Sequence, residues 1–172
     1  MFLNKRYGQA SVAFLRAGWN REATICDAYL LREKARLTPT ATSTARVQAF
    51  TTAANAFIAC ALNSPSKPVK ERLAYYKTAG ECYLEARDPK NAGDSYLNAE
   101  QYGAAAHAYL EGGCIDEMVE VITRYGNTID SGLERLRRAA QLHYFRVFQH
   151  PTYFEICLTP VFNPVFKHWV GT

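Results

Sequence analysis

Few residues of this chain combine the types and the spacing that catalysis or metal binding requires. His143 and His150 lie seven residues apart, which on a helix is two turns along one face and a poor chelate without a third ligand. Cys114 follows a Gly-Gly pair at an expected helix start, a position at which helix dipoles favour thiolates. The sequence contains no GxGxxG, HExxH, GxSxG or GxxxxGKS/T pattern. We therefore expect a protein that is not an enzyme and holds no metal or cofactor, and leave a thiol enzyme at Cys114 as an alternative.

A basic group near the C-terminus offers a different kind of chemistry, contact with phosphates. It lies on an expected helix that begins near residue 131, and it consists of Arg135, Arg137, Arg138 and Arg146. The same arginines are also explained as a solvated face opposite an apolar stripe that contains Leu133 and Leu136. Nucleic-acid binding at this helix therefore stays an alternative to the solvated-face interpretation.

Composition indicates an ordinary folded protein. The chain has 172 residues, 48% of them hydrophobic and 21% charged, and a formal net charge of +4, which permits an anionic partner without requiring one. Its 5 cysteines are scattered and odd in number, which favours a reducing, intracellular compartment, either the cytoplasm or the nucleus. No run approaches the roughly 20 apolar residues of a membrane span, and the N-terminus lacks the apolar core of a secretory signal.

The strongest pattern is an internal repeat. A triplet of a small residue, an aromatic and an aliphatic occurs six times, and its last three copies are spaced by 13 residues: Cys82-Tyr83-Leu84, Ser95-Tyr96-Leu97 and Ala108-Tyr109-Leu110. A second echo, at an offset of 95, relates residues 7–22 to residues 102–117. Repeats of this kind are typical of stacked helical hairpins, which bind partners more often than they catalyse reactions. We expect Tyr83, Tyr96 and Tyr109 to be buried in equivalent positions.

The same spacing predicts about eight helices in an all-α array. A 13-residue interval leaves about ten helical residues and a three-residue turn, so neighbouring helices must run antiparallel. Asn20 and Asp88 are expected to cap helices, and Ser131 begins a capping box. The expected helices are 7–17, 20–37, 44–62, 69–86, 90–99, 102–111, 115–125 and one starting near 131. We assign residues 1–149 to a helical-repeat domain and residues 150–172 to a non-repeat tail rich in proline and aromatic residues.

Residues 76–99 resemble a tetratricopeptide repeat. The motif places are filled by Ala79-Gly80, Tyr83, Ala92, Tyr96 and Ala99, whereas its tryptophan, leucine and proline places hold Tyr76, Ala79 and Ala104. Residues 13–39 and 71–122 also resemble the helical-repeat region of large fungal proteins with a UvrD-like helicase domain, related to the TPR-and-ankyrin-repeat-containing proteins. The resemblance covers about residues 7–125 and implies a right-handed α-solenoid of antiparallel hairpins, taken from a larger multidomain protein.

In tetratricopeptide arrays the first helix of each hairpin lines a concave groove, and this geometry implies a set of partner-binding residues. Carried over to this chain, the set has mixed sign with an acidic bias, and consists of Lys77, Glu81, Glu85, His107 and Glu111. Such a face suits a protein or peptide with basic residues. The resemblance therefore implies a non-catalytic scaffold that binds a protein partner or other domains of a parent chain. The alternative it implies is an accessory nucleic-acid-binding element of a helicase-like protein.

The first expected helix lacks the polar outer face that normally closes a repeat array. It carries Val12, Phe14 and Leu15 instead. We therefore expect one end of the stack to be open and apolar.

Overall fold

The computed structural model describes residues 6–39, 43–63, 69–129 and 132–148, and over these residues the chain is entirely helical, without strands. Eight α-helices and one short 3-10 helix follow in order: α1 (Tyr7–Arg16), α2 (Asn20–Leu37), α3 (Ser43–Leu62), α4 (Val69–Glu85), α5 (Pro89–Asn98), α6 (Tyr102–Glu111), α7 (Ile115–Tyr125), η1 (Gly126–Thr128) and α8 (Leu133–Phe148). The all-α class and the expected number of helices are thus confirmed for this part of the chain. The expected tail, residues 150–172, and the capping residue Ser131 lie outside it.

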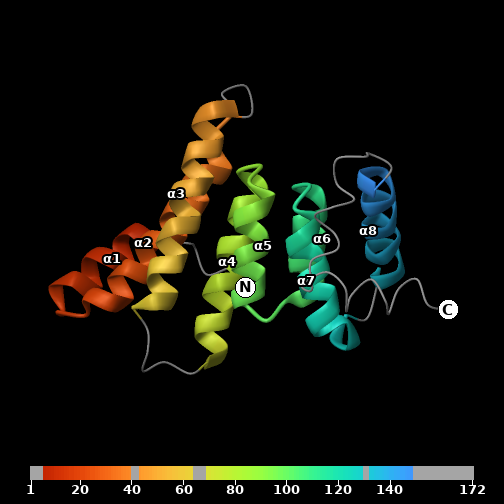
Figure 1. Ribbon diagram of the computed structural model, residues 1–172. Coiled ribbons are helices and arrows are strands. Elements are labelled where there is room, and N and C mark those ends of the chain that lie inside the picture. The colour runs from red at the N-terminus through yellow and green to blue at the C-terminus, as the bar shows by residue number, and fades with distance from the viewer. Residues whose placement is uncertain (1–5, 40–42, 64–68, 130–131, 149–172) are drawn as a thin grey trace.

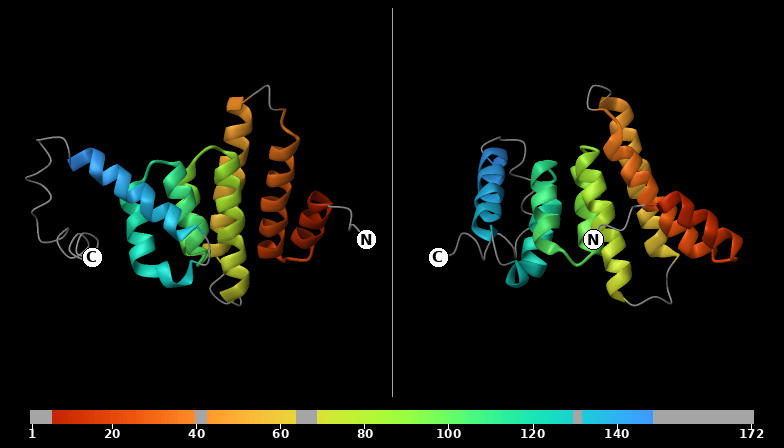
Figure 2. Two further views of the ribbon diagram at one scale, coloured as in Figure 1. Left: turned by 90° about the vertical axis from the view of Figure 1, so that its right-hand side faces the viewer. Right: turned by 180° about the vertical axis from the view of Figure 1, so that it is seen from behind.

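The helices are arranged in the order of the sequence (Figure 1). Each helix packs against the one before it and the one after it, and α8 also contacts α6. Turning the molecule shows that α1 lies at one end of the row and α8 at the other (Figure 2). Contacts therefore run mainly between sequence neighbours, and the buried residues form one continuous cluster along the row, from Ala28 on α2 to Ala140 on α8.

Helix boundaries follow the expected signals closely, with one exception. Helices α5, α6 and α7 begin at residues 89, 102 and 115, so the 13-residue interval is a structural interval. Asp88 caps α5 as expected, because its side chain accepts a hydrogen bond of 3.2 Å from the backbone N–H of Asn91. Asn20 does not cap α2: it is the first helical residue, and the N-cap position is held by Trp19 without a side-chain hydrogen bond.

Four of the six copies of the repeated triplet end a helix with the same turn, those of α1, α4, α5 and α6. In four turns one residue has a positive φ, and the next amide donates to the carbonyl of the aromatic residue five positions earlier, as in a Schellman motif. These bonds are Trp19 to Phe14 (2.8 Å), Asp88 to Tyr83 (2.9 Å), Gln101 to Tyr96 (2.9 Å) and Cys114 to Tyr109 (2.9 Å). The donor of each bond is also the N-cap of the next helix, which explains why three residues suffice between helices.

The residue with positive φ differs among these turns, and the difference predicts a pair of opposite stability effects. Gly113 has φ 69°, which costs glycine little, whereas Glu100 has φ 57° and carries a Cβ that this conformation disfavours. We expect Glu100→Gly to stabilise the protein by about 0.5–1 kcal/mol and Gly113→Ala to destabilise it by a similar amount. Urea denaturation followed by circular dichroism measures both variants. Changes of the same sign in the two variants would contradict the assignment of equivalent turns.

The aromatic residues of the repeat pack on small residues of the preceding helix, as expected. Tyr83, Tyr96 and Tyr109 expose only 6%, 7% and 2% of their surface. A Cβ placed on Gly80 would lie 2.9 Å from Cε1 of Tyr96, and one placed on Gly93 would lie 2.5 Å from Cε1 of Tyr109. Glycine at these two places therefore lets each tyrosine ring lie against the backbone of the helix before it. The prediction of equivalent buried aromatics is confirmed.

Two of these tyrosines also tie neighbouring helices together through their hydroxyl groups. The Tyr83 hydroxyl donates to Oδ1 of Asn55 on α3 at 2.6 Å, and the Tyr109 hydroxyl donates to Oδ1 of Asp94 on α5 at 2.6 Å. Burial, and then the bond to Asp94, raise the pKa of Tyr109, so the hydroxyl stays a proton donor at neutral pH. Each bond fixes the rotation of one helix against the previous one.

Candidate partner-binding pocket

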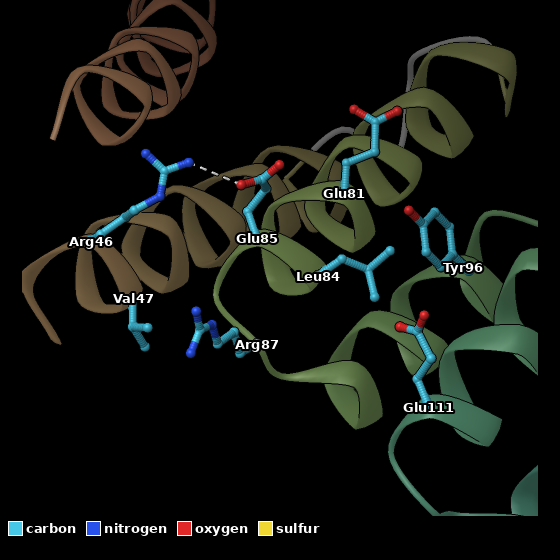
Figure 3. Close-up of a pocket in the computed structure, with 8 residues that line it drawn as sticks. All are labelled: Arg46, Val47, Glu81, Leu84, Glu85, Arg87, Tyr96 and Glu111. Atoms are coloured by element: carbon cyan, nitrogen blue, oxygen red, sulfur yellow. Dashed lines mark hydrogen bonds and ion pairs between the residues drawn. The ribbon is translucent and has the colours of Figure 1, made fainter. Parts of the chain in front are cut away.

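A pocket of about 620 Å³ opens where the α4–α5 turn meets the flanks of α3 and α6 (Figure 3). Its lining combines charged side chains of both signs with two aliphatic ones and a tyrosine: Arg46, Val47, Glu81, Leu84, Glu85, Arg87, Tyr96 and Glu111. The members come from the four successive helices α3 to α6 and from the α4–α5 turn, and the 13-residue repeat brings α4, α5 and α6 to the same place. Apolar side chains with charged groups at their rim are a common lining of protein-binding surfaces.

Two of the three carboxylates in the pocket are held by arginines of earlier helices. Arg32 on α2 bonds Oε2 of Glu81 at 2.5 Å, and Arg46 on α3 bonds Oε2 of Glu85 at 3.0 Å. Arg46 also donates to the Thr38 carbonyl at 3.2 Å. These pairs fix the side chains in place and neutralise part of the acidic bias that the sequence suggested.

The other two charged groups of the pocket are available to a partner. Among the described residues, neither Arg87 nor Glu111 forms a salt bridge, and both side chains are exposed. Figure 3 shows Arg87 on one side of Leu84 and Glu111 on the other, and Leu84 is 37% exposed. The pocket thus presents an apolar contact between an unpaired cation and an unpaired carboxylate.

Tyr96 has a double position, because its ring is buried in the core and its hydroxyl lies at the pocket wall (Figure 3). Burial, and then the neighbouring Glu81 carboxylate, raise the pKa of Tyr96 above its ordinary value. The hydroxyl is therefore neutral at physiological pH and can donate a hydrogen bond to a ligand carbonyl or carboxylate.

Three of the five residues implied by the repeat resemblance meet in this pocket: Glu81, Glu85 and Glu111. Lys77 does not line it and is exposed on α4. His107 lies elsewhere, at a second hollow of about 420 Å³ beside Tyr102 and Ile129, where its ring approaches Gly132. The acidic members of the set therefore share one site, and the lysine and histidine do not.

Other pocket residues gave no functional signal in the sequence. Arg46 and Val47 lie on α3, which precedes the regular 13-residue interval, so no repeat position pointed to them. Leu84 and Tyr96 belong to the repeated triplet and were assigned to packing alone. The geometry of the α4–α5 turn would have identified them. This turn places Leu84, the last residue of one triplet, and the ring of Tyr96, from the next triplet, at the same pocket.

The arginines of α8 lie on the outside of the row of helices. Arg135, Arg137, Arg138 and Arg146 are all exposed, and Arg137 bonds Oε1 of Glu134 at 2.8 Å. The opposite face of α8 is buried through Leu136 and Ala140, as the apolar stripe predicted. This arrangement fits a solvated face and leaves the arginines accessible to phosphates.

Cysteine and metal chemistry find little support in the geometry. Burial raises the pKa of the Cys82 thiol to about 11, and burial also raises the pKa values of Cys26 and Cys60. Cys114 is half-buried and donates its S–H to the Gly112 carbonyl at 3.8 Å.

Within the described residues, no group of three His, Cys, Asp or Glu side chains could hold a metal ion, and His150 is not among these residues. None of the described helices is long and apolar enough to span a bilayer.

Comparisons with protein-family models, with curated proteins and with solved structures give no match for this chain. The likeness to tetratricopeptide repeats and to helicase-associated repeat regions therefore rests on the sequence pattern alone.

Proposed function

We propose that this protein is a non-catalytic, intracellular interaction scaffold that binds a protein segment at the pocket between α3, α4 and α6. The observation that carries the proposal is the exposed Leu84 between the unpaired Arg87 and Glu111. The tetratricopeptide-like pattern supports it, because hairpin arrays of that family bind peptides on the same faces. The partner is a segment of another protein or another domain of the same polypeptide.

The arrangement of charges defines the chemistry of the partner. A basic side chain would meet Glu111, an acidic one would meet Arg87, and an apolar one would cover Leu84. On a helix these three side chains share one face when they are four residues apart. We therefore propose a partner helix with the pattern acidic, apolar, basic at successive four-residue steps.

The test uses a synthetic, fluorescein-labelled, alanine-based helix with Glu, Leu and Arg at these steps. We expect its fluorescence anisotropy to rise as full-length protein is added, and Glu111→Lys to weaken binding by about three- to tenfold, because the substitution places two cations together. Glu120→Lys is the matched control, since Glu120 is an exposed glutamate of α7 outside the pocket. Equal weakening by both variants, or no binding of the peptide to the parent protein, would count against the proposal.

The alternative is an accessory nucleic-acid-binding element of a helicase-like protein, and its supporting observation is the exposure of the four α8 arginines. It ranks second because Glu134 occupies Arg137 and places a negative charge within the basic group. Binding through phosphates would weaken steeply with added salt and would not respond to Glu111→Lys.

A further inference from the structure

The outer face of α1 exposes large apolar side chains at the end of the row of helices. Val12, Leu15 and Trp19 are 49%, 53% and 58% exposed, and the Trp19 ring stacks on Phe14 with centroids 5.8 Å apart. This exposure confirms the open apolar end that the sequence predicted. Contiguous apolar surface of this kind marks an interaction site more often than it occurs without a partner.

The internal repeat provides a covered copy of the side of α1 that carries Phe14. Val12 and Leu15 instead correspond to the half-buried His107 and Leu110, on the opposite side of the helix. Helix α1 and the turn after it match α6 and its turn at the offset of 95, with Phe14, Ala17 and Glu22 in the places of Tyr109, Gly112 and Glu117. Both turns have a glycine with positive φ, Gly18 and Gly113, and both have the same Schellman hydrogen bond. The two junctions are therefore built alike, and what covers α6 shows what α1 is shaped to receive.

Helix α5 covers α6, its turn and the start of α7 through three contacts. Gly93 receives the ring of Tyr109, and Pro89 lies against Gly112, 3.1 Å from the position of an added Cβ. Lys90 on α5 forms a salt bridge of 3.2 Å with Glu117 on α7. Under this cover Ala108 exposes only 3% of its surface.

None of the described helices covers α1 in this way. Ala13, the counterpart of the buried Ala108, is exposed, and Phe14 is only half-buried where Tyr109 is buried. Glu22 stands in the place of Glu117 without a counterpart of Lys90 among the described ion pairs. Helix α1 and its turn thus have the small residue, the aromatic ring and the carboxylate that α5 contacts on α6 and α7. The described part of the chain has no helix that contacts them in the same way.

We propose that the face of α1 formed by Ala13, Phe14 and Ala17, with Trp19 stacked beside it, binds a helix of a partner protein in the register in which α5 covers α6. The partner helix presents glycine or alanine to Phe14 and, three residues earlier, lysine or arginine to Glu22, as Gly93 and Lys90 do for Tyr109 and Glu117. A second copy of this chain fits poorly. Its own α5 is already packed on α6, and α1 carries Arg16 and no acidic residue and follows Arg6 at its N-cap, so two α1 faces would bring like charges together.

The test supplies such a helix in cis, where a high effective concentration makes even a weak fit measurable. A copy of residues 88–101 replaces residues 1–6 directly before Tyr7 in the full chain, with Trp169→Phe so that Trp19 is the only tryptophan. The matched control carries Gly93→Leu within the copy alone. We expect the melting temperature of the extended chain to exceed that of the control by at least about 3 °C, and the Trp19 emission to move to shorter wavelength.

Identical melting temperatures and Trp19 emission for the extended chain and its control would overturn the proposal. A mass that doubles with concentration in the parent chain, and stays monomeric in Trp19→Ser, would also overturn it by assigning the face to a second copy. The pocket of the proposed function lies on other helices, so Glu111→Lys is expected to leave this result unchanged. The two proposals can therefore fail independently.

Discussion

Replacing Tyr109 by alanine is expected to destabilise the protein by about 3–5 kcal/mol, because the substitution removes a fully buried ring and leaves a cavity between α5 and α6. This loss is a large share of the stability of a typical domain, so the variant should unfold at a much lower urea concentration. Circular dichroism during urea titration measures the shift.

Tyr109→Phe is the matched control for that result. It keeps the ring and removes only the hydroxyl that bonds Asp94 at 2.6 Å, so we expect a cost of about 0.5–1.5 kcal/mol. If Tyr109→Ala unfolds at the same urea concentration as the parent protein, the aromatic residue is not the packing element of the repeat.

The second large effect is expected at the glycine beneath that ring. Gly93→Ala should destabilise the protein by about 1–3 kcal/mol although alanine favours helices, because the new methyl group would lie 2.5 Å from Cε1 of Tyr109. The buried ring is held by its bond to Asp94 and has little room to move. Thermal and urea unfolding of the purified variant measure the loss.

Gly103→Ala separates this contact from the general effect of a helix glycine. The nearest atom to a Cβ at Gly103 is Cγ2 of Ile129 at 3.7 Å, an ordinary contact, so this variant should be neutral or slightly more stable. Gly80→Ala should fall between the two, because its Cβ would lie 2.9 Å from the Tyr96 ring. If Gly93→Ala stabilises the protein, the Tyr109 ring does not depend on the space that glycine leaves at position 93.

The fold was predictable from the sequence in the part of the chain where the 13-residue unit of helix and turn recurs, from α4 to α7. The 13-residue interval, the glycine or alanine before each aromatic and Asp88-Pro89 together specify α5 and the turns on either side of it, and the structure has them where expected. The capping residue of α2 was mistaken by one position, because Trp19 is both the end of a Schellman turn and the N-cap. Asn20 looked like a cap only when residue type was considered without the turn.

The candidate site was only partly predictable, for a reason that lies in tertiary structure. A repeat identifies positions on equivalent helices, and it pointed to Glu81, Glu85 and Glu111, which the structure brings to one pocket. It could not indicate that Arg32 and Arg46, from helices outside the regular interval, would pair with two of these carboxylates. Nor could it show that Arg87, in the turn between α4 and α5, lines the pocket without a salt-bridge partner among the described residues.

The most direct test of the central claim is to map where a partner helix binds, using two-dimensional NMR of the isotope-labelled full chain during titration with the Glu-Leu-Arg peptide. We expect the backbone amide signals of Leu84, Arg87, Tyr96 and Glu111 to shift together and saturate, and the signals of the α8 arginines to stay in place. Shifts confined to α8, or no saturable shift at these four residues, would contradict the claim that this pocket binds a protein segment.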